Sequence, residues 1–167
     1  RVSIGGRTLR VRFSNAFGRT PLTLLSARVA RARGGSAIDP ATDRALTFGG
    51  TQAATIPPGE GLLCDALEFE LLALSDLAVT IHVRGAPAEV TGHPGSRATS
   101  YLQAGQAVSA PALPDAVPVD HWYILAGIDV LAPRTAGAVV ILGDSITDGR
   151  GSTTNGNDRW PDVLARR

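Results

Sequence analysis

Hydrophobic and polar residues alternate in short runs from residue 1 to about residue 130. Between positions 9 and 14, Leu9, Val11 and Phe13 alternate with arginine and serine, and the same alternation returns at 67–71 and 77–83. Successive side chains of a strand point to opposite faces of its sheet. Each run therefore predicts a half-buried strand in an antiparallel sheet.

Segments rich in glycine and proline separate these runs. The stretches GGSAIDPATD, IPPGEG and RGAPAEVTGHPGS would break a helix or a central strand and are predicted as loops. The Gly5–Gly6 pair predicts a tight hairpin between two paired strands, and HWYILAGIDV, residues 121–130, predicts one further strand. Together these signals predict that residues 1–134 form a mainly β accessory domain, similar to a sandwich or a jelly roll.

The pattern changes after LAPRTAGA, a segment of linker composition. AVVIL, residues 138–142, has no alternation, which is typical of a strand buried on both faces in a parallel sheet. Trp160, Val163 and Leu164 follow at helical spacing, with Asn157 or Asp158 as a cap and Pro161 in the first turn. Residues 135–167 are predicted to begin a three-layer α/β domain that is incomplete within this chain, because one strand and part of one helix cannot bury their apolar faces.

The composition is that of an ordinary globular protein and excludes several partners. Of 167 residues 44% are hydrophobic and 19% are charged, and sixteen arginines against fifteen acids leave a net charge of +1. This balance gives no strong field for nucleic acid. No apolar stretch reaches the roughly 20 residues of a membrane span. Cys64 is the one cysteine and is predicted to be a small buried residue.

Ser145 is the candidate nucleophile, because it directly follows the predicted buried strand, at the edge of an α/β sheet where ligands bind. Gly143 and Gly149 leave the backbone free to turn sharply around it. A phosphate-binding loop is disfavoured, because GDSITDGR lacks the required spacing and carries two aspartates. The alternative is a serine that merely ends a strand.

The stretch GDSITDG, followed by GST and RWPDVLA, resembles the first conserved block of the SGNH, or GDSL-type, serine hydrolases. The upstream segments RVRFSNAFGRTPL, DRALTFGG, DLAVTIHV and TGHPG are similar to the β-rich region that precedes the catalytic domain in one bacterial branch of that family. The resemblance covers nearly the whole chain.

The resemblance implies an esterase without cofactor or metal. Ser145 would attack the acyl carbonyl while its backbone N–H serves as an oxyanion donor, and Asp144 would be a structural neighbour of the nucleophile. The family takes its other oxyanion donors from a glycine and an asparagine, and its base from an Asp-x-x-His, all farther along the chain. None of these follows Ser145 here, so residues 1–167 alone are expected to be inactive. The expected substrate is a small-molecule or polysaccharide ester.

The three histidines all precede Ser145 and have no metal-ligand spacing. His82 falls on the polar face of a predicted strand and is expected to be solvated. His93, in a loop rich in glycine and proline, is expected to be a turn residue, although a functional contact stays open. His121 is expected to pack against neighbouring aromatic residues.

Two other roles stay open for the β domain. Trp122, Tyr123 and Tyr101 would form a sugar-stacking surface if the domain were a carbohydrate-binding module. The other role is a scaffold that packs beside the active site.

A secreted enzyme that removes acetyl groups from polysaccharides and an intracellular short-chain esterase both fit the sequence. The start of the chain inside a predicted strand suggests further residues upstream.

Overall fold

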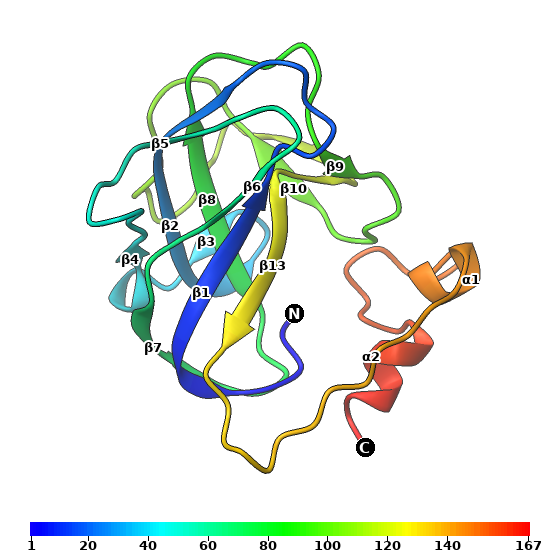
Figure 1. Cartoon of the computed structure of the whole chain (residues 1–167). Helices are drawn as coiled ribbons and strands as arrows, with labels where there is room; N and C mark the ends of the chain where they lie inside the picture. Colours follow the sequence, from blue (N-terminus) through cyan, green and yellow to red (C-terminus); the bar gives the residue numbers. More distant parts are fainter.

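The chain folds into a β-rich domain that is followed by a segment with two short helices (Figure 1). The computed structural model describes all residues from 1 to 167. The strands are β1 (Gly6–Ser14), β2 (Leu22–Gly34), β3 (Ala37–Ile38), β4 (Arg44–Ala45), β5 (Ala54–Ile56), β6 (Gly61–Leu63), β7 (Leu67–Leu71), β8 (Leu77–Val83), β9 (Gly92–His93), β10 (Ser100–Leu102), β11 (Val117–Val119), β12 (Trp122–Tyr123) and β13 (Leu125–Val130). A 3-10 turn spans Pro40–Thr42, and the helices are α1 (Ser145–Asp148) and α2 (Trp160–Leu164).

Two larger sheets are each organised around one long strand, and all their pairings are antiparallel. In the first sheet, β1 pairs with β13, β6 and β7. In the second, β2 pairs with β8 and with the short strands β3, β4 and β5. Two small sheets, β10 with β11 and β9 with β12, complete the domain. The β-rich domain predicted from the sequence is confirmed, and so are the antiparallel strands predicted at 67–71 and 77–83, since β7 pairs with β1 and β8 pairs with β2.

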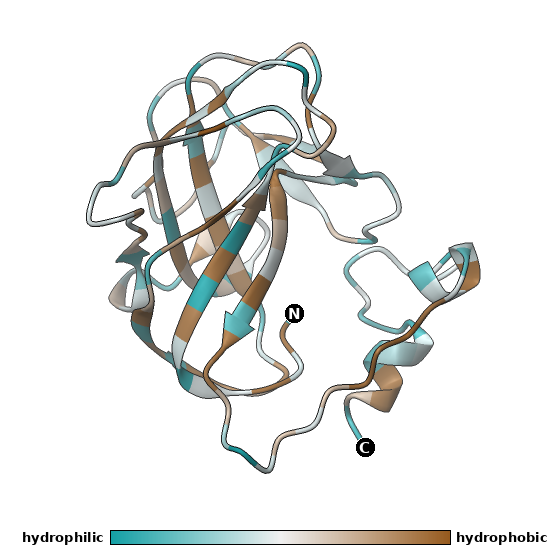
Figure 2. Cartoon of the chain, viewed as in Figure 1, coloured by the Kyte–Doolittle hydropathy of each residue, from teal (hydrophilic) through white to brown (hydrophobic).

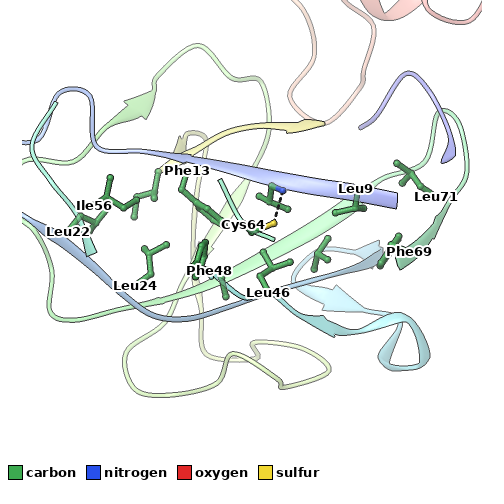
Figure 3. Packing of buried hydrophobic residues seen from close by; sticks show 14 residues of the cluster. Leu9, Phe13, Leu22, Leu24, Leu46, Phe48, Ile56, Cys64, Phe69 and Leu71 are labelled. Carbon is green, nitrogen blue, oxygen red and sulfur yellow. Dashed lines mark hydrogen bonds between the residues drawn. The ribbon is translucent and has the colours of Figure 1, made fainter. Parts of the chain in front are cut away.

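The core lies between the two larger sheets (Figure 3). The alternation in β1 places Leu9, Val11 and Phe13 inside, each at most 1% exposed, while its arginines face outward. Phe13 meets Phe48 edge to face, with ring centroids 5.7 Å apart. Burying an aromatic ring of this size contributes roughly 2 to 3 kcal/mol from the transfer of apolar surface alone. The predicted inward face of β1 is therefore the main wall of the core.

Cys64 belongs to this core and is fully buried, as the sequence predicts. Its Sγ accepts a hydrogen bond from the Val11 backbone N–H at 3.0 Å, which Figure 3 shows as a dashed line. Burial raises the pKa of the Cys64 thiol, because the thiolate would lose its hydration. The residue joins β1 to the segment that follows β6.

The predicted hairpin at Gly5–Gly6 is wrong. β1 begins at Gly6, neither glycine adopts a positive φ, and residues 1–5 form no strand. Val2 instead donates its backbone N–H to the carbonyl of Ser75, at 3.0 Å, and a Cβ at Gly5 would lie 2.7 Å from the Leu71 carbonyl oxygen. Gly5 therefore serves the close approach of two backbones, and Gly6 makes room for the Val130 side chain. Periodicity cannot distinguish that role from a turn.

The single strand predicted over residues 121–130 is divided into β12 and β13. Ile124 separates them with a φ of 66°, which is rare for a β-branched residue. It is 6% exposed, donates its N–H to the Thr91 carbonyl and accepts from the Ser14 N–H. The two strands consequently enter different sheets, β12 beside β9 and β13 beside β1.

The predicted strand at AVVIL is not formed. Residues 131–144 contain a turn at 134–135 and form no strand, and Figure 2 shows the continuous hydrophobic stretch that leads to α1. Val140 is 92% exposed and Leu142 is fully exposed. A strand needs neighbouring strands as hydrogen-bond partners, and residues 135–167 contain two short helices and no strand. These residues therefore do not show the α/β sheet that the pattern predicts.

Candidate functional site

The turn at residues 143–149 places Ser145 at the first position of α1. Asp144 is the N-cap, and its carboxylate accepts a hydrogen bond from the Ile146 backbone N–H at 3.0 Å. Such a cap satisfies one of the free N–H groups at a helix start. The predicted structural role of Asp144 beside the serine thus has a specific form: this carboxylate holds the backbone on which Ser145 sits.

Two glycines close the turn on either side of the serine. Gly149 ends α1 in the left-handed region with a φ of 105°, and its N–H donates to the Ile146 carbonyl. The next amide, from Arg150, donates to the Ser145 carbonyl at 2.7 Å. Gly143 lies against the Thr147 side chain, and a Cβ there would collide with it. Glycine is therefore needed at position 149 for its positive φ and at position 143 for its small size.

The Ser145 side chain is exposed, and its hydroxyl makes no hydrogen bond within the chain. The hydroxyl therefore faces solvent at the start of the helix, next to the exposed hydrophobic stretch 139–142. None of the three histidine side chains is hydrogen-bonded to Ser145. The geometry thus presents the predicted nucleophile without the base that would activate it.

His93 is not the turn residue expected from the sequence: it ends β9, directly before the turn at 94–95, and its side chain lies against the 143–149 turn. Its Nε2 lies 2.8 Å from one carboxylate oxygen of Asp148 and 2.9 Å from the other. Asp148 is the last residue of α1, three positions after Ser145. The histidine ring also packs at an angle against Trp122, with centroids 5.8 Å apart. His93 therefore contacts the end of the helix that begins at Ser145, and a functional role for this contact stays a prediction.

Further contacts join the loop at residues 92–99 to the helical segment. Arg97 Nε donates to the Gly149 carbonyl at 3.0 Å, and its own carbonyl accepts from the Asn155 N–H at 2.8 Å. Asn155 and Thr99 exchange two hydrogen bonds through their side chains and the Thr99 N–H. The sequence analysis missed these contacts, because partners more than 50 positions apart leave no periodic signal.

The other two histidines lie elsewhere on the β domain. His82, in β8, is half-buried and lines a cavity of about 430 Å³ with Ser26 and Gln106, so the expectation of a solvated side chain is only partly met. His121 packs edge to face on Tyr123 with centroids 6.5 Å apart, as expected. Its Nδ1 lies 2.8 Å from the Pro94 carbonyl oxygen, which supports the 92–99 loop.

The aromatic residues considered for sugar stacking are divided between two small sheets. Trp122 and Tyr123 form β12, and Tyr101 belongs to β10. All three are half-buried, and Tyr123 packs against the core. Trp122 is in contact with His93 and hence adjoins the 143–149 turn through Asp148.

The predicted helix after the turn is present as α2, with Pro161 in its first turn. Its N-cap is Arg159, so the expectation of Asn157 or Asp158 as cap is wrong. The Arg159 guanidinium pairs with Asp162 at 2.7 Å, and this hydrogen bond raises the pKa of Arg159. The Asp158 carboxylate bonds Thr153 instead, which lowers the pKa of Asp158. Arg159 takes the N-cap position because its backbone N–H and its guanidinium both donate to the Asp162 carboxylate in the first turn of α2.

The comparisons with known proteins leave the family open. No family model matches this chain, and no curated protein matches it at a significant level. The structure gathers no three histidine, cysteine, aspartate or glutamate side chains close enough to hold a metal ion. None of its helices has the length and apolar character that a membrane crossing needs.

Proposed function

We propose that this chain is part of an SGNH-type serine hydrolase that cleaves carboxylic esters, with Ser145 as the nucleophile. The observation that carries the proposal is the position of Ser145, exposed and without a hydrogen-bond partner at the start of a helix held by Asp144 and Gly149. A hydroxyl in this place is accessible to a substrate carbonyl. The resemblance of GDSITDG and RWPDVLA to the SGNH family supplies the reaction class.

The reaction would proceed through an acyl-serine intermediate. Ser145 Oγ forms a bond to the carbonyl carbon, a general base takes the hydroxyl proton, and the alcohol leaves with a proton returned by that base. Water then attacks the acyl-serine, releasing the carboxylic acid and restoring the hydroxyl. The Ser145 backbone N–H, which no residue of the chain occupies as acceptor, is free to donate to the developing oxyanion.

We further propose that the base comes from outside residues 1–167. None of the three histidine side chains is hydrogen-bonded to Ser145: His93 Nε2 lies against Asp148, His121 Nδ1 lies against the Pro94 carbonyl, and His82 is on β8, which pairs with β2. The exposed stretch 139–142 supports the same proposal, because a contiguous exposed apolar patch commonly marks a surface that another element covers. Additional strands of an α/β sheet would cover it.

The experiment is hydrolysis of p-nitrophenyl acetate by the 167-residue chain and by a chain that continues with an SGNH-type Asp-x-x-His segment. Each is compared with its Ser145→Ala variant, and with Ser3→Ala as the matched control because Ser3 is also exposed and forms no hydrogen bond. We expect turnover only in the longer chain, lost by at least about 10³-fold in Ser145→Ala and unchanged in Ser3→Ala.

Two results would contradict this proposal. Ser145-dependent turnover by the short chain would mean that one of its three histidines is the base. Turnover in the longer chain that survives Ser145→Ala would exclude the serine as nucleophile. A polysaccharide substrate is tested separately, by release of acetate from acetylated xylan.

A further inference from the structure

The β domain touches the 143–149 turn through one loop, residues 92–99. Two of its side chains hold the two consecutive residues that end α1: His93 bonds the Asp148 carboxylate and Arg97 bonds the Gly149 carbonyl. The His121 ring in turn bonds the Pro94 carbonyl within this loop, at 2.8 Å. The helix that begins at Ser145 is thus held at its other end by a loop from a different part of the chain.

Gly95 shows that this contact depends on close approach. A Cβ at Gly95 would collide with Asp148 Oδ2 and would lie 3.6 Å from His93 Nε2. The absence of a side chain at Gly95 therefore leaves room for the Asp148 carboxylate, which an added Cβ would push aside. Gly95 has no positive φ, so an alanine there would be resisted by Asp148 and not by its own backbone.

We infer that the 92–99 loop is a positioning element for Ser145, with His93 and Arg97 fixing the orientation of the helix that carries the hydroxyl. This inference rests on the proposed function. α1 has only four residues and no buried side chain, so its own interior does not determine its direction. The four-residue helix is instead fixed at Asp144 by its cap and at Asp148 and Gly149 by the β domain. The domain is then an integral part of the catalytic unit.

The consequence for catalysis is geometric. A nucleophile must lie close to van der Waals distance from the carbonyl carbon and in line with it, and a displacement of about 1 Å can cost on the order of 100-fold in rate. Since His93 and Arg97 lie at the far end of the helix from the hydroxyl, their loss would move the nucleophile without removing a group that touches the substrate. His93 is accordingly a positioning residue.

The first test needs no activity. Trypsin cleaves after Arg150, which directly follows the turn, and after Arg134, which lies exposed in the linker and serves as an internal reference. We compare initial cleavage rates at both sites, by mass spectrometry, in His93→Ala and Gly95→Ala. The matched controls are His82→Ala, on β8, and Gly137→Ala, where an added Cβ meets nothing within 4 Å.

We expect cleavage after Arg150 to rise about threefold to tenfold in His93→Ala and Gly95→Ala, as loss of a partly exposed hydrogen-bonded contact would give. Cleavage after Arg134 should stay the same, and both control variants should match the unaltered chain. Unchanged cleavage after Arg150 in His93→Ala and Gly95→Ala would overturn the inference. An equal rise at both sites would also overturn it, since that indicates general unfolding.

The second test uses a chain with Ser145-dependent ester hydrolysis. We expect kcat to fall about tenfold to a hundredfold in His93→Ala and Gly95→Ala with KM nearly unchanged, because the serine is displaced while the binding surface stays. A loss in KM alone would overturn the positioning role. If hydrolysis survives Ser145→Ala, the proposed function fails, and the trypsin comparison still decides whether the loop holds the turn.

Discussion

The imidazole of His93 lies 2.8 Å from a carboxylate oxygen of Asp148, and this pair joins the β domain to the helix that begins at Ser145. The side chains are 36% and 44% exposed, so water weakens their attraction. The pair is therefore significant for the position of the helix rather than for its electrostatic attraction. A histidine in a β-domain loop meets the end of a four-residue helix that has no interior packing of its own.

We predict that Asn15→Ala lowers the free energy of unfolding by about 2 to 3 kcal/mol. Asn15 is 2% exposed, and its Nδ2 donates to the carbonyls of Thr20, Ile56 and Pro57 at 2.9 to 3.2 Å. Alanine would leave these acceptors without their donor. Urea unfolding followed by tryptophan fluorescence measures the loss, with the exposed Gln106→Ala as control. A loss below about 0.5 kcal/mol would contradict the prediction.

Asp65 should contribute stability that disappears in acid. Hydrogen bonds from the Gly50 N–H, the Thr47 hydroxyl and the Gly49 N–H lower the pKa of its carboxyl in the folded chain. The contribution is therefore complete above the unfolded value of roughly 4, and it is lost as the pH falls through the lower folded value.

The measurement is the free energy of unfolding of the native chain and of Asp65→Asn between pH 2 and pH 7. We expect the two to differ by a constant amount above about pH 5 and to converge as the pH falls below roughly 4. Asp115→Asn is the control, because Asp115 is exposed and makes no hydrogen bond. A difference that grows toward low pH would contradict the stated sign.

We predict that the Cys64 thiol resists alkylation in the folded chain. It is fully buried, and burial raises its pKa, so both access and thiolate content are low. At pH 8 we expect iodoacetamide to react at least about 100-fold more slowly with the native chain than with the chain in 8 M urea, in line with local opening as the limiting step. Similar rates would mean that β1 and the segment after β6 separate readily.

Substituting Val140 and Leu142 by serine should change solubility and leave folding intact. The two side chains are 92% and 100% exposed, so neither contributes to the core, and we expect the free energy of unfolding to change by less than about 0.5 kcal/mol. Fluorescence of a hydrophobic dye should fall, together with any self-association seen by light scattering. A loss of more than about 1 kcal/mol would show that this stretch is packed.

The strands with one buried face could be predicted because alternation records burial directly. Leu9, Val11 and Phe13 are inside, and Phe69 and Leu71 in β7 follow the same rule. The continuous run at 138–142 was misleading, since such a run indicates that a strand would be buried where partners exist, and residues 135–167 provide none. The hairpin predicted at Gly5 and Gly6 was wrong for a related reason. A glycine required for its small size and a glycine required for a turn look the same in a sequence.

The sequence by itself determined the inward face of β1, the burial of Cys64 and the β-rich character of the domain, because these depend on periodicity and composition. Only the tertiary structure decided that His93 reaches Asp148, that Arg97 reaches Gly149, and that Gly95 leaves room for the Asp148 carboxylate. These partners lie more than 50 positions apart, and contacts between distant segments arise from how the sheets pack, which no local pattern records.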